Sequence, residues 1–321
     1  MVGMPPSRIV RAITIAFGAA AAAGAAQLGI GYGLGVFSWV PTVNGVDEAA
    51  WLASLAWTVW ISATSVVIGT VAADRLGLAS VGLTPLGRTM WRGTLAIAAS
   101  LGGLIVVALT AVPARATQRP DTFAPQMIVG TYAVAGVIFG LVVALIAVNI
   151  PAIASNVTIT SAWLWLVAVV ATLDGAAANR DPEVVQLGVW QVTTSGPWFH
   201  SIYVPGSLLA AGSAIVIGAL AAWPAANRGT NLIGVALSGA AGPAVIAGAY
   251  LLAAPVLKGV KPEQLSAHLV APYAVIAGLI GSVLVAALAG AGRRRLAGRS
   301  ANYKQPGAVS AAQPKVASDA V

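Results

Sequence analysis

The 321-residue chain is 58% hydrophobic and 8% charged, and its mean hydropathy is +0.87. Soluble domains usually carry about 25% charged residues, so this composition excludes a soluble enzyme, a nucleic-acid-binding domain and a disordered protein. Cysteine is absent, which excludes disulfides, thiolate nucleophiles and cysteine-based metal sites.

Apolar stretches divide the chain into membrane spans, because a bilayer core of about 30 Å needs about 20 apolar residues per helix. The sequence predicts an all-α, polytopic transmembrane helical bundle with eight spans. They lie at residues 12–38, 50–73, 93–113, 127–149, 157–175, 206–225, 231–254 and 271–291. Residues 175–205 are expected to form an external loop. Residues 293–321 are expected to form a disordered cytoplasmic tail.

The positions of Lys and Arg predict the orientation. With the N-terminus in the cytoplasm, 12 of the 17 basic residues fall on cytoplasmic segments, including the cluster Arg293-Arg294-Arg295. Arg outnumbers Lys 13 to 4, which is typical of GC-rich bacterial genes. We therefore expect a bacterial cytoplasmic membrane protein with both termini in the cytoplasm.

The N-terminus has a second interpretation. Arg8 and Arg11 precede an apolar, Ala-rich stretch, as in a secretory signal peptide. The apolar run continues to Val40, which is too long for the short core of such a peptide, so an uncleaved first helix is expected. Cleavage would leave seven spans and an external N-terminus.

Short sequence matches recur in the same order in two parts of the chain. Each pair has the same place in spans 1 and 5, 2 and 6, 3 and 7, or 4 and 8. These matches predict two parallel four-helix repeats, residues 1–150 and 151–292, related by an axis along the membrane normal. The pairs are Ile13-Thr14 with Ile159-Thr160, Val67-Ile68-Gly69 with Val216-Ile217-Gly218, Arg92-Gly93-Thr94 with Arg228-Gly229-Thr230, and Tyr132-Ala133-Val134 with Tyr273-Ala274-Val275.

Ionisable residues are missing from the middle of every predicted span. Because such residues mark proton relays and ion pathways, a proton-coupled pump and an ion-coupled carrier are disfavoured. An intramembrane enzyme is disfavoured for the same reason, since it would need acid or base groups in the spans. The two histidines, His200 and His268, lie in separate loops and lack metal-ligand spacing. No catalytic residue, cofactor or metal site is expected.

Four residues within the spans are candidates for lining a cavity between the halves: Trp57, Trp60, Asn156 and Ser238. Trp57 and Trp60 are three residues apart and therefore share one helix face. Packing is the commoner role for such tryptophans, and hydrogen bonding between helices is the commoner role for Asn and Ser.

The external loop holds three further candidates, Trp190, Trp198 and His200. Binding residues concentrate on loops held by a rigid frame, so the loop could form a lid or recognition surface. The commoner interpretation is a solvated loop whose aromatic residues reach the lipid headgroups.

Glycine spacing predicts close helix contacts and one broken helix. GxxxG pairs at 29/33, 31/35 and 136/140 would let helix backbones approach each other. The segment from Ser238 to Pro243 combines two glycines with a proline, which favours a kink or break in the seventh span.

The leading interpretation is a non-enzymatic membrane component or partner-binding subunit. Its expected partners are the lipid bilayer and another membrane protein or a second copy in a homo-oligomer, and no nucleic acid is expected. The alternative is a transporter or channel for a small neutral or weakly polar solute, with the path between the two halves. A cavity between the halves would favour the transporter, and a filled interface of small residues would favour the scaffold.

Overall fold

The computed structural model describes residues 5–37, 39, 48–76, 83–117, 123–178, 185–190, 202–254 and 262–303. The side chains of residue 263 and residues 296–303 are not described. The elements are α1 (Pro6–Gly33), α2 (Glu48–Leu76), α3 (Pro85–Gly103), α4 (Ile105–Ala114), α5 (Pro125–Ala147), α6 (Pro151–Ala177), α7 (Val204–Asn227), α8 (Leu232–Leu237), the 3₁₀ helix η1 (Ser238–Ala240), α9 (Ala241–Ala253) and α10 (Pro262–Tyr303).

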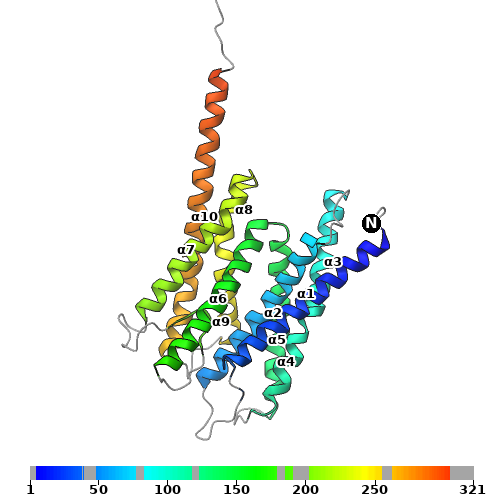
Figure 1. Cartoon of the computed structure of the whole chain (residues 1–321), viewed down its shortest axis with the longest axis vertical. Coiled ribbons are helices and arrows are strands. Elements are labelled where there is room, and N and C mark those ends of the chain that lie inside the picture. Colours follow the sequence, from blue (N-terminus) through cyan, green and yellow to red (C-terminus); the bar gives the residue numbers. More distant parts are fainter. Residues whose placement is uncertain are drawn as a thin grey trace, which may run out of the picture.

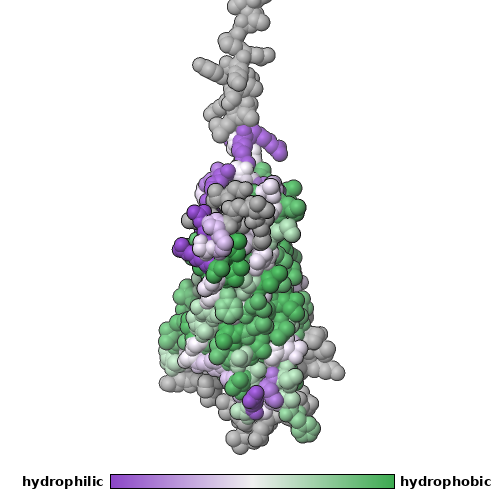
Figure 2. Space-filling view, turned by 90° about the vertical axis from the view of Figure 1, so that its right-hand side faces the viewer, coloured by the Kyte–Doolittle hydropathy of each residue, from purple (hydrophilic) through white to green (hydrophobic). Residues whose placement is uncertain are grey.

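Eight helical spans in the described residues are long and apolar enough to cross a membrane, and they confirm the eight predicted spans. α3 and α4 together form the third span, and α8, η1 and α9 form the seventh (Figure 1). On the face shown in Figure 2, a broad hydrophobic surface separates hydrophilic residues at the two ends of the bundle. The protein is an all-α, multi-pass membrane protein.

Proline sets the start of several helices. It stands at the first or second position of α1, α3, α5, α6 and α7, where its missing N–H would be unpaired in any case. Two starts carry a side-chain cap. Thr84 Oγ1 accepts the Gly87 N–H at 3.2 Å, and Asn231 Oδ1 accepts the Ile233 N–H at 3.0 Å.

α2 is the central helix of the bundle and is buried along most of its length. It nevertheless carries several hydroxyl side chains on its buried surface. Those of Ser54, Thr58, Ser65 and Thr70 donate to the carbonyl four residues earlier, at 2.6 to 2.8 Å. These bonds satisfy the hydroxyl donors without a partner on another helix.

Gly136 and Gly140 let α5 pack directly on α2, as their spacing predicts. A Cβ atom on Gly140 would lie 2.6 Å from the Ala63 Cα, and one on Gly136 would lie 2.7 Å from the Val59 carbonyl oxygen. Any larger side chain would push the two backbones apart, so this predicted contact is confirmed.

The glycine pairs near residue 30 do not join two helices. A Cβ atom on Gly29 or Gly33 would meet nothing within 4 Å, and one on Gly31 would meet the ring of Phe37 at 2.7 Å and the ring of Trp165 at 3.5 Å, with no helix backbone among these contacts. Gly35 lies beyond the end of α1 with φ +69°, a conformation that glycine adopts readily. The predicted close helix contact is wrong here, because Gly29 and Gly33 lie on a face of α1 that meets no other described helix and Gly35 lies beyond the helix end.

Two spans are interrupted. The seventh changes to a 3₁₀ turn at Ser238–Ala240, which confirms the predicted break. The third is divided at Leu104, and the sequence analysis did not anticipate that division.

α10 continues beyond the bundle to Tyr303 (Figure 1). Residues 293–303 are therefore helical, although the disordered tail was expected to begin at residue 293. The segment includes Arg, Leu and Ala, which favour helix. Residues 304–321 and most of the predicted external loop lie outside the described residues.

Candidate functional site

The contact between the two halves is filled by aromatic side chains. α2 of the first half packs against α6 and α9 of the second. Trp57 is fully buried there, and its Nε1 donates to the Val185 carbonyl at 2.8 Å. Its ring centroid lies 5.1 Å from that of Trp165. Trp57 therefore acts as a packing residue with a satisfied indole N–H.

Gln27 joins three helices beside this aromatic pair. Its Oε1 accepts the Trp165 Nε1–H at 3.0 Å and the Thr64 hydroxyl at 3.3 Å. Its Nε2 donates to Ser65 Oγ at 3.3 Å. Sequence reasoning did not single out Gln27, although it is an amide in the middle of an apolar span. The resulting network is uncharged and links α1, α2 and α6.

Asn156 and Ser238 lie near the break in the seventh span. Both are fully buried. Asn156 Oδ1 accepts the Gly242 N–H at 2.6 Å, and Ser238 Oγ donates to the Val235 carbonyl at 2.7 Å. These bonds support the interrupted backbone. Trp60 is also fully buried, and its Nε1 has no hydrogen-bond partner in the described part of the chain.

Of the loop candidates, only Trp190 falls within the described residues. Its Nε1 donates to Asp174 Oδ2 at 3.3 Å, which ties the segment 185–190 to the end of α6. Trp198 and His200 lie outside the described residues.

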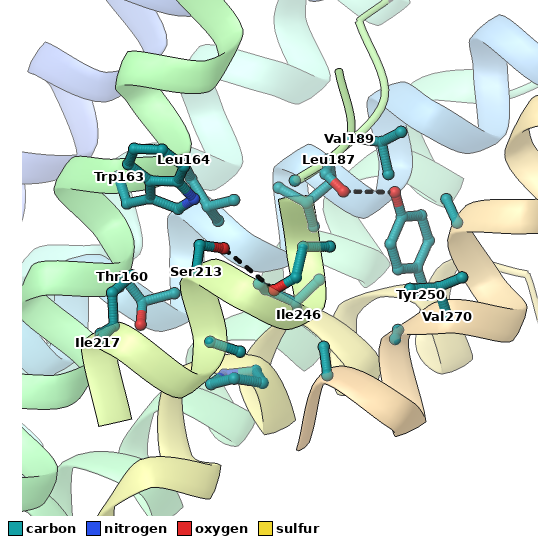
Figure 3. A pocket seen from close by; sticks show the side chains of 17 residues that line it. Thr160, Trp163, Leu164, Leu187, Val189, Ser213, Ile217, Ile246, Tyr250 and Val270 are labelled. Atoms are coloured by element: carbon teal, nitrogen blue, oxygen red, sulfur yellow. Dashed lines mark hydrogen bonds between the residues drawn. The ribbon is translucent and has the colours of Figure 1, made fainter. Parts of the chain in front are cut away.

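A cavity of about 40 Å³ lies inside the second half, between α6, α7, α9 and α10 (Figure 3). Residues 187–189 cover one end of it. Of the seven residues predicted from the sequence, the five that fall within the described part of the chain do not line this space. Many of the side chains that face the cavity are small, so the surrounding helices leave its centre empty. They include Ala210, Ala214, Ala267, Ala271 and Ala274.

Three hydroxyl side chains line the cavity: those of Thr160 and Tyr250 at its two ends, and that of Ser213, which donates to the Ala210 carbonyl at 3.0 Å. At one end Thr160 is 4% exposed, and its hydroxyl has no partner among the described residues. At the other end Tyr250 donates its hydroxyl to the Leu187 carbonyl at 2.6 Å (Figure 3). Among the described residues that line the cavity, none is ionisable at neutral pH. The space is thus mainly apolar with one unpaired hydroxyl.

The cavity is closed on one side and open on another. Leu164, Leu187 and Tyr250 are fully buried. Trp163 on α6 and Ala210 and Ser213 on α7 are only half-buried. The space therefore approaches the molecular surface between α6 and α7.

No family model, curated protein or solved structure matches this chain. Within the described residues, no three His, Asp or Glu side chains form a group that could hold a metal ion. The cavity is one part of the described structure that offers space for a ligand.

Proposed function

We propose that this protein is a non-enzymatic membrane component whose second half binds a lipid-soluble molecule. The observation that carries the proposal is the cavity between α6, α7, α9 and α10. Its volume, about 40 Å³, exceeds the roughly 10–15 Å³ that one water needs. A water there would lack most of the two to four polar partners that it requires. An apolar occupant fits these walls better.

The depth of the open side favours a ligand that arrives from the bilayer. Trp163 lies near the middle of α6, and Ser213 lies near the middle of α7. An opening at that depth faces hydrocarbon. A lipid acyl chain, or another molecule dissolved among the chains, could enter without crossing a polar layer.

The packing between the halves supports binding over transport. A solute path would need space between the first and second halves, where Trp57, Trp165 and Gln27 are in contact. The absence of an acid or base among the described cavity-lining residues supports a non-enzymatic role.

The proposal includes an internal duplication, in which the chain consists of two four-helix repeats. Arg92 precedes the interruption at Leu104 by the same number of residues as Arg228 precedes the end of the 3₁₀ turn at Ala240. In both halves a glycine of the fourth span packs on the backbone of the second, Gly140 in α5 and Gly281 in α10. These parallels support two four-helix repeats.

We place both termini in the cytoplasm of a bacterial cell. The start of α1 and the far end of α10 lie at the same end of the bundle (Figure 1), as eight spans require. The arginines at 293–295 lie at that end, which supports the cytoplasmic assignment.

Photo-crosslinking tests the proposal. The full-length protein is placed in lipid nanodiscs that contain a lipid with a photoreactive group in its acyl chain. Crosslinked positions are then found by peptide mass spectrometry. We expect crosslinks on Trp163, Ser213 and Ala271 at a higher level than on lipid-facing positions.

Ala271→Leu is the decisive variant because it fills the cavity from α10. This substitution should reduce crosslinking at the cavity positions to the level found at lipid-facing positions. The matched control is Ala287→Leu, the same change at an exposed position of the same helix, and it should change nothing. Equal crosslinking in the wild type and in Ala271→Leu would refute the proposal.

A further inference from the structure

Buried polar atoms occur on α10 and in the segment 185–190, which both contribute residues to the cavity wall. Gln264 in α10 is fully buried, and neither its amide nitrogen nor its amide oxygen has a partner among the described residues. His268, one turn later, has its Nδ1 2.9 Å from the Gln264 carbonyl oxygen, and its imidazole also interacts with the Tyr250 backbone. Gln186 Oε1 is a third buried polar atom without a described partner.

These atoms are unusual for a folded protein. The large majority of buried polar side-chain atoms have at least one hydrogen-bond partner. Burying an amide without one costs free energy that a well-packed leucine would not. Several unpaired atoms in one region therefore indicate a ligand that supplies the missing hydrogen bonds.

The group shares its walls with the cavity. Gln264 begins a stripe on α10 that continues through the cavity-lining residues Ala267, Ala271 and Ala274. The ring of Tyr250, another lining residue, lies 4.4 Å from the ring of His268. Gln186 directly precedes Leu187, which also lines the cavity. A molecule whose chain occupies the cavity would thus have its polar end near Gln264 and His268.

We infer that Gln264, His268 and Gln186 bind the uncharged, hydroxyl-bearing head of a lipid whose chain enters the cavity. This inference rests on the proposed function and names the class of lipid. The amide and imidazole groups offer both donors and acceptors, which match the donor and acceptor of a hydroxyl.

The same chemistry disfavours a phosphate head. Phosphate is usually bound by Arg or Lys, or by several backbone N–H groups. No described Arg or Lys belongs to the group. Burying an anion beside neutral amides would leave its charge without a partner.

Competition in nanodiscs tests the inference with two lipids of identical chains. The photoreactive probe is a diacylglycerol, and the competitors are unlabelled diacylglycerol and unlabelled phosphatidic acid. We expect diacylglycerol to compete at a concentration about tenfold lower than phosphatidic acid. A tenfold difference in affinity corresponds to the loss of roughly one hydrogen bond. Gln264→Leu should weaken diacylglycerol binding by about tenfold. Gln126→Leu, the same change at the start of α5, should have no effect.

A stability measurement separates binding from a structural role. Without added ligand, Gln264→Leu should unfold at the same temperature as the wild type or higher, because leucine buries no unpaired amide. A clear fall in unfolding temperature would overturn the inference.

The two proposals fail in different ways. If Ala271→Leu abolishes crosslinking but phosphatidic acid competes as well as diacylglycerol, the head-group inference is overturned and lipid binding in the cavity stands. The same holds if Gln264→Leu leaves diacylglycerol binding unchanged. If Ala271→Leu has no effect on crosslinking, both proposals are overturned together.

Discussion

Asn156 replaces a backbone interaction where the seventh span is interrupted. Its Oδ1 accepts the Gly242 N–H, which lies in the first turn of α9 and would otherwise be without an acceptor in the membrane. Gly242 is required for this approach, because a Cβ atom there would lie 2.1 Å from Thr160 Oγ1. Close contact of α6 with α9 therefore depends on the absence of one side chain.

Gly242→Ala tests this contact. The added methyl group must displace Thr160 and Asn156, so we expect the free energy of unfolding to fall by about 1–3 kcal/mol. Thermal unfolding of the purified protein in detergent measures the change. Gly212→Ala in α7 is the control, since nothing lies within 4 Å of Gly212 and alanine favours helix. If the two variants were equally stable, α6 and α9 would accommodate the added methyl group without any loss of free energy of unfolding.

Sequence reasoning at this scale named Asn156 and Ser238 as candidates for a cavity wall, with hydrogen bonding between helices as the commoner role for such residues. Both form hydrogen bonds near a helix break, and neither lines the observed space. The spacing of Gly136 and Gly140 predicted a contact that exists, while the pair Gly29 and Gly33 predicted one that does not. Spacing shows that a helix face is small, but tertiary placement decides whether another helix lies on it.

At the scale of elements, three helices are joined at one end of the first half by Arg92. Its Nε and Nη2 contact the two carboxylate oxygens of Asp74, each at 3.2 Å, and its Nη1 donates to Asn149 Oδ1 at 3.1 Å. These residues lie at the end of α2, on α3 and just after α5. The Asp74 and Arg92 side chains are 17% and 22% exposed, so water partly screens the pair.

A double-mutant cycle measures the strength of this pair. Asp74→Asn and Arg92→Gln should each lower the free energy of unfolding, and the combined variant should lose less than the sum. We expect a coupling of roughly 0.5–1 kcal/mol, because the geometry is bidentate but the pair is partly solvated. The coupling should shrink at high salt. Strict additivity of the two substitutions would mean that the pair contributes nothing.

The eight spans could be predicted because each is a long apolar stretch. The division of the third span at Leu104 was not predicted. No proline marks that position. Gly102 lies so close to Phe17 that a Cβ atom there would be 2.1 Å from the Phe17 carbonyl oxygen. The approach of α1 to α3 is a tertiary contact, and the one local signal beside the break is the pair Gly102-Gly103, which loosens the helix.

At the scale of the whole molecule, the two halves differ in how they fill their centres. α2 carries the large, fully buried Trp57, Trp60 and Ile61, and it is enclosed by α1, α3 and α5 of its own half and by α6 and α9 of the second. α7, its counterpart in the proposed repeat, presents Ala210 and Ser213 to the cavity and exposes other side chains such as Leu208 to the surroundings. The sequence shows the small side chains, but the empty space between them depends on the relative positions of four helices. The cavity was therefore beyond sequence reasoning.

Orientation is the last prediction, and the absence of cysteine makes it direct to test. Leu86, in the first turn of α3, and Phe123, between the end of α4 and the start of α5, are strongly exposed near opposite ends of the third span. With both termini in the cytoplasm, a membrane-impermeant maleimide should label Phe123→Cys in intact spheroplasts and should label Leu86→Cys only after the membrane is opened. A cytoplasmic reporter fused after Lys304 should be active in the same cells. The reverse labelling pattern would invert the whole molecule, because the 12 basic residues assigned to the cytoplasm would then lie outside. Labelling of both cysteines from outside would instead mean that the third span does not cross the membrane.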